Sequence, residues 1–283
     1  MAKKIEKPKL RHMATLGSLT GYGNKKGEWS TEQKIQAVKK AGFDGFVSRV
    51  PMITKEHVEN SGLLFACTVD IGGIPEIRGK LKAIKEVGAR CVNVQMLDHD
   101  TTTKRALEVA RRVMAAADDL EMDVAIEVHR DTCTETPEKA YALAAGFEKA
   151  EKKPLKMTWD FSHPAVVKHL SPPYWDRLAE RPDLIQHAQQ FHFRPFNGHH
   201  AQIPALGRGG KLTPEFLDWL DFAEAVIACW LQTAKPGQEM FSCPEQIAGG
   251  YYLSVFGDRW KDVLAIKKEL ERVWRKQLRK WKA

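Results

Sequence analysis

The chain has 283 residues, a mass of 32.0 kDa and a formal net charge of +8 at pH 7. No apolar run approaches the roughly 18 residues that cross a bilayer, so we expect no membrane partner. The positive charge would suit a nucleic-acid partner. However, residues 1–11 carry +4, residues 256–283 carry +6 and residues 12–255 carry −2. Because the body is nearly neutral, we expect no nucleic-acid partner.

The two basic ends have different sequences. Residues 1–11 form a basic N-terminal extension without the apolar core of a secretory signal, so we expect a cytoplasmic protein. The C-terminal ELERVWRKQLRKWKA predicts an amphipathic helix. Its stripe with Trp274 and Trp281 is expected to pack on the body or to form a subunit contact. The five cysteines show no CxxC spacing, which argues against a disulfide framework or a zinc ribbon.

Short apolar runs alternate with helical segments along the whole chain. No composition break divides it, so we expect a single domain over residues 1–283. The predicted strands are 13–17, 45–50, 63–70, 91–97, 123–129, 155–161, 189–194 and 239–245.

Helix signals fill the gaps between these strands. Ser30 with Gln33 has the pattern of a capping box. Thr136-Pro137 and Thr213-Pro214 each place a cap residue before a proline suited to a first helical turn. Residues 103–120 repeat apolar side chains at intervals of three and four, which predicts a helix.

This alternation predicts an α/β fold. Eight strand-and-helix units in 283 residues match the size of a (β/α)8 TIM barrel with a basic C-terminal helix. A doubly wound open sheet is the alternative, but it more often carries a GxGxxG turn after the first strand. The segment LGSLTGYGNKKG lacks that spacing, which favours the barrel.

In a barrel, residues that do chemistry lie at the carboxyl ends of the strands. The last four predicted strands end in ionisable or imidazole side chains, namely Glu127, His129, Asp160, His163, His192, Arg194 and Glu245. Three carboxylates and one imidazole suit a divalent cation such as Mn²⁺, Mg²⁺ or Co²⁺ better than a thiolate-type zinc site. We therefore expect a metal held by Glu127, Asp160, His192 and Glu245.

The runs VAIEVH, WDFSH, QQFHFRP, ALGRGG and CPEQ resemble the xylose isomerase-like TIM barrel superfamily of sugar isomerases and epimerases, over about residues 12–270. The resemblance implies the same four metal ligands, with Mn²⁺ as the first candidate and Mg²⁺, Co²⁺ or Zn²⁺ as alternatives. It also implies catalytic roles for Glu127 and Glu245 in proton transfer and a substrate-contacting His163. It further implies a dimer or tetramer.

The resemblance implies a sugar isomerase or epimerase that acts on a ketose or a related carbohydrate. In such chemistry a metal stabilises the enediolate that forms when an α proton leaves. His163 and Arg194 could hold the oxygen on which charge develops. His129 and Arg130 could bind substrate hydroxyls or a phosphate, although Arg130 could instead pair with Asp131.

Other functions remain open. A metal-dependent lyase or dehydratase acting on a keto-sugar, keto-glycoside or cyclitol would share the first step. The related AP endonucleases hold three zinc ions and need extra histidines on the second and third strands, which here end in SRV and TVDI. A barrel that has lost activity and only binds a partner is a third alternative. It is disfavoured because the four predicted metal ligands and His163 are all present. The loop of residues 195–210 is long for a connection and is expected to cover the site as a lid.

Overall fold

Eight parallel strands close into a barrel in the computed structural model, which describes residues 5–25 and 27–282. Strand β1 pairs with β4 on one side and with β10 on the other, which closes the ring. The barrel strands are β1 (Lys9–Thr15), β4 (Gly45–Ser48), β5 (Leu64–Ile71), β6 (Cys91–Met96), β7 (Val124–Val128), β8 (Met157–Trp159), β9 (Gln190–Phe193) and β10 (Glu239–Pro244). The predicted barrel and its eight strands are confirmed.

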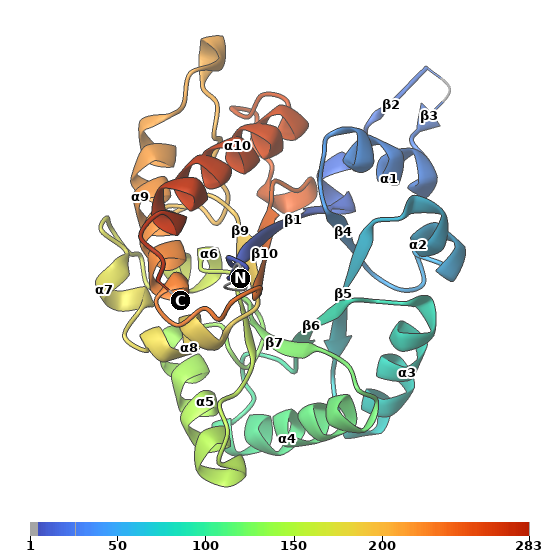
Figure 1. Cartoon of the computed structure of the whole chain (residues 1–283), viewed down its shortest axis with the longest axis vertical. Coiled ribbons are helices and arrows are strands. Elements are labelled where there is room, and N and C mark those ends of the chain that lie inside the picture. Colours follow the sequence, from blue (N-terminus) through green and yellow to red (C-terminus); the bar gives the residue numbers. More distant parts are fainter. Residues whose placement is uncertain (1–4, 26, 283) are drawn as a thin grey trace.

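Helices surround this barrel (Figure 1). They are α1 (Thr31–Lys40), α2 (Lys55–Ser61), α3 (Ile77–Val87), α4 (Thr103–Asp119), α5 (Pro137–Glu151), α6 (Ser162–Val167), α7 (Trp175–Leu178), α8 (Pro182–His187), α9 (Pro214–Leu231) and α10 (Arg259–Leu278). Short 3-10 turns η1 (Leu16–Leu19), η2 (Ile74–Glu76), η3 (Arg208–Gly210) and η4 (Gly249–Tyr251) lie in the connections. A small antiparallel pair, β2 (Gly23–Asn24) with β3 (Gly27–Glu28), precedes α1. None of the described helices is long and apolar enough to cross a membrane.

The predicted helix starts are confirmed by their capping bonds. Ser30 Oγ accepts a hydrogen bond from the Gln33 backbone amide, and Gln33 Oε1 accepts one from the Ser30 backbone amide, which completes the capping box of α1. Thr136 and Thr213 cap α5 and α9 by accepting a hydrogen bond from one backbone amide each, and a proline stands in each first turn. These bonds satisfy amide groups that the first turn of a helix leaves free.

Apolar side chains occupy both faces of the barrel wall. The larger core lies between the strands and the helices, and a smaller cluster of Met13, Val47, Ala66, Cys91, Phe241 and Cys243 gathers side chains of the strands themselves. Gly45 makes room for this cluster, because a Cβ at that position would collide with the Leu64 carbonyl and the Met13 side chain. The packed strands provide a rigid support for the residues at their carboxyl ends.

The chain ends differ in part from the prediction. Strand β1 begins at Lys9, four residues before the predicted start. The prediction that residues 1–11 form an extension is therefore wrong for residues 9–11, which belong to the barrel. Arg11 lies in this strand and its guanidinium is 2.7 Å from Glu239 Oε1 and 3.0 Å from Asp44 Oδ1, which explains why the strand continues through charged residues. Residues 1–4 lie outside the described part.

The predicted C-terminal helix is confirmed as α10. Trp274 is buried and lies against Trp230 of α9, with ring centroids 5.9 Å apart. The indole of Trp281, just beyond α10, donates a hydrogen bond to the Ala234 carbonyl at 3.0 Å. The tryptophan stripe therefore packs on the body of the same chain. The helix that carries Trp274, α10, lies beside α9 (Figure 1).

Candidate functional site

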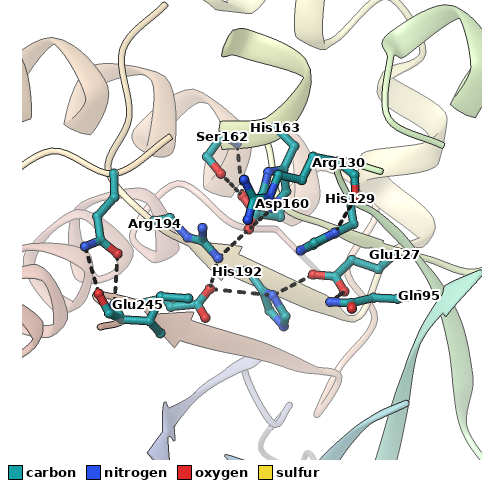
Figure 2. Close-up of polar contacts among 12 residues, drawn as sticks. Gln95, Glu127, His129, Arg130, Asp160, Ser162, His163, His192, Arg194 and Glu245 are labelled. Carbon is teal, nitrogen blue, oxygen red and sulfur yellow. Dashed lines mark hydrogen bonds and ion pairs between the residues drawn. The ribbon is translucent and has the colours of Figure 1, made fainter. Parts of the chain in front are cut away.

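The carboxyl ends of four consecutive barrel strands bring the predicted site residues together. Glu127 lies in β7 and His192 in β9, while Asp160, Arg194 and Glu245 directly follow β8, β9 and β10. Figure 2 shows the carboxylates of Glu127, Asp160 and Glu245 around the His192 and Arg194 side chains. The sequence prediction of one cluster at this end of the barrel is therefore correct.

Glu127, Asp160 and His192 form a compact group of potential metal ligands. Each is buried, and one ligand atom from each lies within 4.8 Å of the others. His192 Nδ1 is 2.9 Å from Glu127 Oε1. Two oxygens, Glu127 Oε1 and Asp160 Oδ2, are buried without a hydrogen bond of normal geometry. A carboxylate oxygen in that state is ready to bind a cation, so these three residues fit a divalent metal.

Glu245 lies beside this group. Its Oε2 atom is 3.8 Å from His192 Nδ1 and 2.9 Å from an Arg194 nitrogen, which donates a hydrogen bond to it. In this arrangement Glu245 is engaged by the guanidinium, and its role as a fourth ligand remains a prediction. The same Arg194 nitrogen is 3.2 Å from Asp160 Oδ2.

Two amides that the sequence analysis missed hold Glu127. Asn93 and Gln95 each donate a side-chain hydrogen bond to Glu127 Oε2, at 2.6 and 2.8 Å. Arg49 donates to Gln95 Oε1 at 2.9 Å, which orients the amide so that its NH₂ group faces Glu127. The signal was present in CVNVQM, where two polar residues two positions apart interrupt an apolar strand and therefore share a face.

Asp160 is oriented by the turn that follows β8. Its Oδ1 accepts hydrogen bonds from the Ser162 amide at 3.0 Å and the Ser162 hydroxyl at 2.5 Å. His163 Nε2 lies 3.3 Å from Asp160 Oδ2. The His163 ring also contacts the His129 ring, with centroids 4.1 Å apart. The DxxH spacing thus places its histidine directly at the Asp160 carboxylate.

Tyr251 is a further site residue that the sequence analysis missed. Its ring lies between two guanidinium groups, 4.4 Å from Arg194 and 4.5 Å from Arg130. Tyr251 belongs to η4, in the loop between β10 and α10, and no motif marks it. Arg130 makes no salt bridge among the described residues, and Asp131 instead pairs with His99 at 2.7 Å. The alternative role of Arg130, a pair with Asp131, is therefore not found among the described residues.

The predicted lid of residues 195–210 is packed into the structure. Phe196, Gln202 and Ala205 are buried. Gln202 exchanges hydrogen bonds with the Ile247 backbone and donates one to the Tyr251 carbonyl at 3.3 Å. This segment therefore supports the loop that carries Tyr251, and its exposed parts are His199, His200 and residues 207–210.

The charges of the site keep its groups in defined protonation states. Burial alone would raise the pKa of Glu127, but the positive charge and hydrogen bond of His192 lower it to about 2. Burial would lower the pKa of His192, but Glu127, Glu245 and Asp160 raise it to about 9. Burial opposes ionisation of Asp160, yet Arg194 and His163 hold its pKa well below its usual range. Burial lowers the pKa of His163 to about 4 despite Asp160, so this imidazole is neutral at pH 7.

A cavity of about 600 Å³ opens above these groups. Its wall includes Glu127, His192 and Glu245 at the base and His129, Arg130 and Tyr251 at the rim. Pockets that bind small molecules in proteins span roughly 300–1,000 Å³. The cavity is therefore large enough for a small-molecule ligand in contact with the buried carboxylates.

Comparisons with known proteins identify the fold. No protein-family model matches the sequence, and no curated protein matches it. Solved structures do match in fold. The 3-keto-D-glucoside 4-epimerase from E. coli shares 14% identity, with 93% of this chain and 100% of that chain covered and a TM-score of 0.57.

Two further solved structures match as closely in shape. A xylose isomerase-like TIM barrel protein from Mycobacterium smegmatis, in complex with magnesium, has 15% identity, coverage of 94% of this chain and 97% of that chain, and a TM-score of 0.57. A probable 3-DHS dehydratase from Bacillus anthracis has 14% identity, coverage of 93% and 98%, and a TM-score of 0.56. At these identities the likeness shows the fold alone.

Proposed function

We propose that this chain, which has the fold of the xylose isomerase-like TIM barrels, is a divalent-metal-dependent sugar isomerase or epimerase. The observation that carries the proposal is the buried group of Glu127, Asp160 and His192, with ligand atoms within 4.8 Å of one another at the base of a cavity that also contains Glu245. The E. coli neighbour is named as a keto-glucoside epimerase, which supports a carbohydrate substrate.

Glu127, Asp160 and His192 would hold the metal, with Mn²⁺ as the first candidate and Glu245 as a candidate fourth ligand. When bound, a divalent cation would polarise a carbonyl and an adjacent hydroxyl and stabilise the enediolate left after α-proton removal. Oxygen-rich ligand sets suit Mn²⁺ and Mg²⁺, and the neighbour from Mycobacterium smegmatis is complexed with magnesium. Three carboxylates, one guanidinium and one divalent cation would make the site neutral, with His192 in its uncharged form.

The two glutamates are the proposed proton-transfer pair. Both carboxylates border the His192 imidazole, with Glu127 Oε1 at 2.9 Å and Glu245 Oε2 at 3.8 Å from Nδ1. One carboxylate would take the α proton and the other would return a proton to the opposite face of that carbon, which epimerises it. Return to the neighbouring atom would instead give an isomer.

The remaining polar groups would bind the substrate. Neutral His163 and the Arg194 guanidinium lie beside Asp160 and can donate hydrogen bonds to an oxygen on which negative charge grows. His129 and Arg130 line the rim of the same cavity and would hold hydroxyl or anionic groups. A small carbohydrate would therefore be the partner, and no nucleic acid is needed.

Proton exchange tests this proposal. The Mn²⁺-loaded protein is incubated in deuterated water with a panel of ketoses and keto-glycosides, and the product is examined by NMR. We expect deuterium at the α carbon together with an epimer or isomer. Glu127→Gln should abolish exchange, while Glu239→Gln, at the opposite end of the barrel, should preserve it. No exchange with any substrate would overturn the proposed function.

A lyase or dehydratase is the second candidate, because one structural neighbour is named as a probable dehydratase. The first step would be the same proton removal, followed by loss of a β substituent instead of proton return. In the same NMR experiment, a released fragment or water with a new double bond in the product would favour this reaction. Recovery of an epimer with all its substituents would exclude it for that substrate.

A further inference from the structure

A second cavity adjoins the first at the carboxyl ends of β5, β6 and β7. Its volume is about 590 Å³, close to the 600 Å³ of the cavity above the carboxylates. The two cavities share Gln95, His129 and Arg130 in their walls. Because ligand pockets span roughly 300–1,000 Å³, each of the two spaces can take a ring of its own. A ligand lying across the shared wall residues would occupy both.

The second cavity presents hydrogen-bond acceptors with free capacity. Asp70 Oδ2 accepts from Arg49 at 2.6 Å, and Asp131 Oδ1 accepts from His99 at 2.7 Å. Among the residues described, the other oxygen of each carboxylate accepts no hydrogen bond, and both side chains are largely exposed. A carboxylate oxygen accepts readily from hydroxyl groups. This wall therefore favours a ligand with several hydroxyls over an apolar one.

Arg130 stands between the two cavities without a carboxylate partner in the described chain. It rests on the Tyr251 ring at 4.5 Å and lines both spaces. A guanidinium carries five N–H donors in a planar fork. Arg130 therefore adds donors for ring or bridging oxygens next to the acceptors of Asp70 and Asp131.

The backbone around the second cavity is held in an unusual conformation. Leu97 and Asp131, which follow β6 and β7, both have φ of 59° and both line this space. Aspartate tolerates the left-handed region, whereas leucine rarely adopts it. Strained residues of this kind concentrate at ligand sites, where the surrounding structure holds them in place.

We propose that the second cavity is a subsite for a second hydroxyl-rich ring, so that the substrate is a glycoside of disaccharide size. The reacting sugar would lie above Glu127, and the second ring would contact Asp70, Asp131 and Arg130. This inference rests on the proposed function, because it assigns the reacting sugar to the first cavity.

A cavity-filling variant separates the two spaces. Gly72 lines the second cavity only, and a Cβ there would meet nothing closer than Glu76 Oε1 at 3.4 Å. Gly72→Leu should therefore fill the second cavity and leave the first unchanged. Gly79→Leu in α3 is the matched control, because a Cβ at that position has no neighbour within 4 Å. Asp131→Ala provides a second test variant from another wall of the cavity.

The experiment compares ketoses with the same ketoses carrying a second sugar, for example fructose with lactulose, maltulose and isomaltulose. The readout is kcat/KM for α-proton exchange in deuterated water. We expect at least one disaccharide to exceed its ketose by tenfold or more. Gly72→Leu and Asp131→Ala should remove the advantage of the disaccharide and leave kcat/KM on the ketose within twofold of the parent value. Gly79→Leu should keep the advantage. Equal rates on ketoses and disaccharides, or equal losses on both, would overturn the subsite.

Binding distinguishes failure of the subsite from failure of the proposed function. If no member of the panel exchanges a proton, the proposed function fails, and calorimetric titration with the same sugar pairs decides the inference. Tighter binding of a disaccharide than of its ketose, lost in Gly72→Leu and kept in Gly79→Leu, would support the subsite. Equal binding, or binding of neither sugar, would overturn it.

Discussion

Arg194 holds Glu245 through a guanidinium nitrogen that lies 2.9 Å from its Oε2 atom, inside a site otherwise rich in carboxylates. The same nitrogen is 3.2 Å from Asp160 Oδ2. Arg194 is 3% exposed, so its charge is screened little by water. It therefore supplies one fixed positive charge to a site with three carboxylates and leaves room for a divalent cation to balance the remainder.

Loss of Arg194 should destabilise the metal-free protein strongly. Arg194→Leu leaves Asp160 and Glu245 buried without their cation, and breaking a buried ion pair from one side costs about 3–5 kcal/mol. The measurement is urea unfolding in the presence of EDTA. Arg130→Leu is the matched control, because it contacts the same Tyr251 ring but makes no salt bridge among the residues described. If Arg194→Leu lowered the free energy of unfolding no more than Arg130→Leu does, the structural role of Arg194 would be contradicted.

Gln95 should support catalysis by positioning Glu127, although it takes no part in the proton transfer itself. Its amide donates to Glu127 Oε2 at 2.8 Å. A hydrogen bond to a charged group contributes about 1.5–3 kcal/mol. Gln95→Leu is therefore expected to reduce kcat/KM by roughly tenfold to a hundredfold, measured by α-proton exchange. Gln36→Leu, on the exposed face of α1, should leave the rate unchanged. Equal rates for both variants would exclude a positioning role.

Asp262 in α10 should make the protein less stable as pH rises. Burial raises its pKa to about 6, although it accepts a hydrogen bond from the Leu206 amide at 3.0 Å. The unfolded chain releases this proton near pH 3.9, whereas the folded chain keeps it until about pH 6. The stability that the raised pKa provides is therefore complete below pH 3.9 and lost as pH passes 6.

The test variant is Asp262→Asn, which keeps an acceptor for Leu206. Above pH 6 its free energy of unfolding should exceed that of the parent by roughly 2–3 kcal/mol, and near pH 4 the two should converge. Asp258→Asn, at the N-cap of the same helix, should change the free energy of unfolding in the opposite direction. Burial opposes ionisation of Asp258, but hydrogen bonds from Tyr22 and the Trp260 and Lys261 amides lower its pKa. Urea unfolding from pH 4 to pH 8 measures both. If Asp262→Asn changed the free energy of unfolding by the same amount at every pH, the raised pKa of Asp262 would be contradicted.

The sequence predicted the strands and the clustering of the site because both depend on local patterns. Apolar runs define strands, and a polar residue at the end of such a run must lie at the barrel mouth. Arg11 does not fit this pattern, because its charge is neutralised by Asp44 and Glu239, which are distant in the sequence. The start of β1 was therefore placed too late.

Long-range partners also explain what was missed in the site. Tyr251 has no local signal, and its position depends on the bonds that Gln202 makes with the loop after β10. Arg130 does not pair with Asp131, because His99 forms a hydrogen bond with the Asp131 carboxylate. The sequence suggests a pair between adjacent residues, but it does not show that a third side chain competes for one of them.

We propose above all that Glu127, Asp160 and His192 bind one divalent cation. Calorimetric titration of the metal-free protein with Mn²⁺ at pH 7.5, in two buffers of different ionisation enthalpy, tests it most directly. His192 has its pKa raised to about 9, burial notwithstanding, by Glu127, Glu245 and Asp160, and it must lose its proton to bind a metal. We expect one bound Mn²⁺ and about one released proton per chain. No binding, or three bound ions, would contradict it.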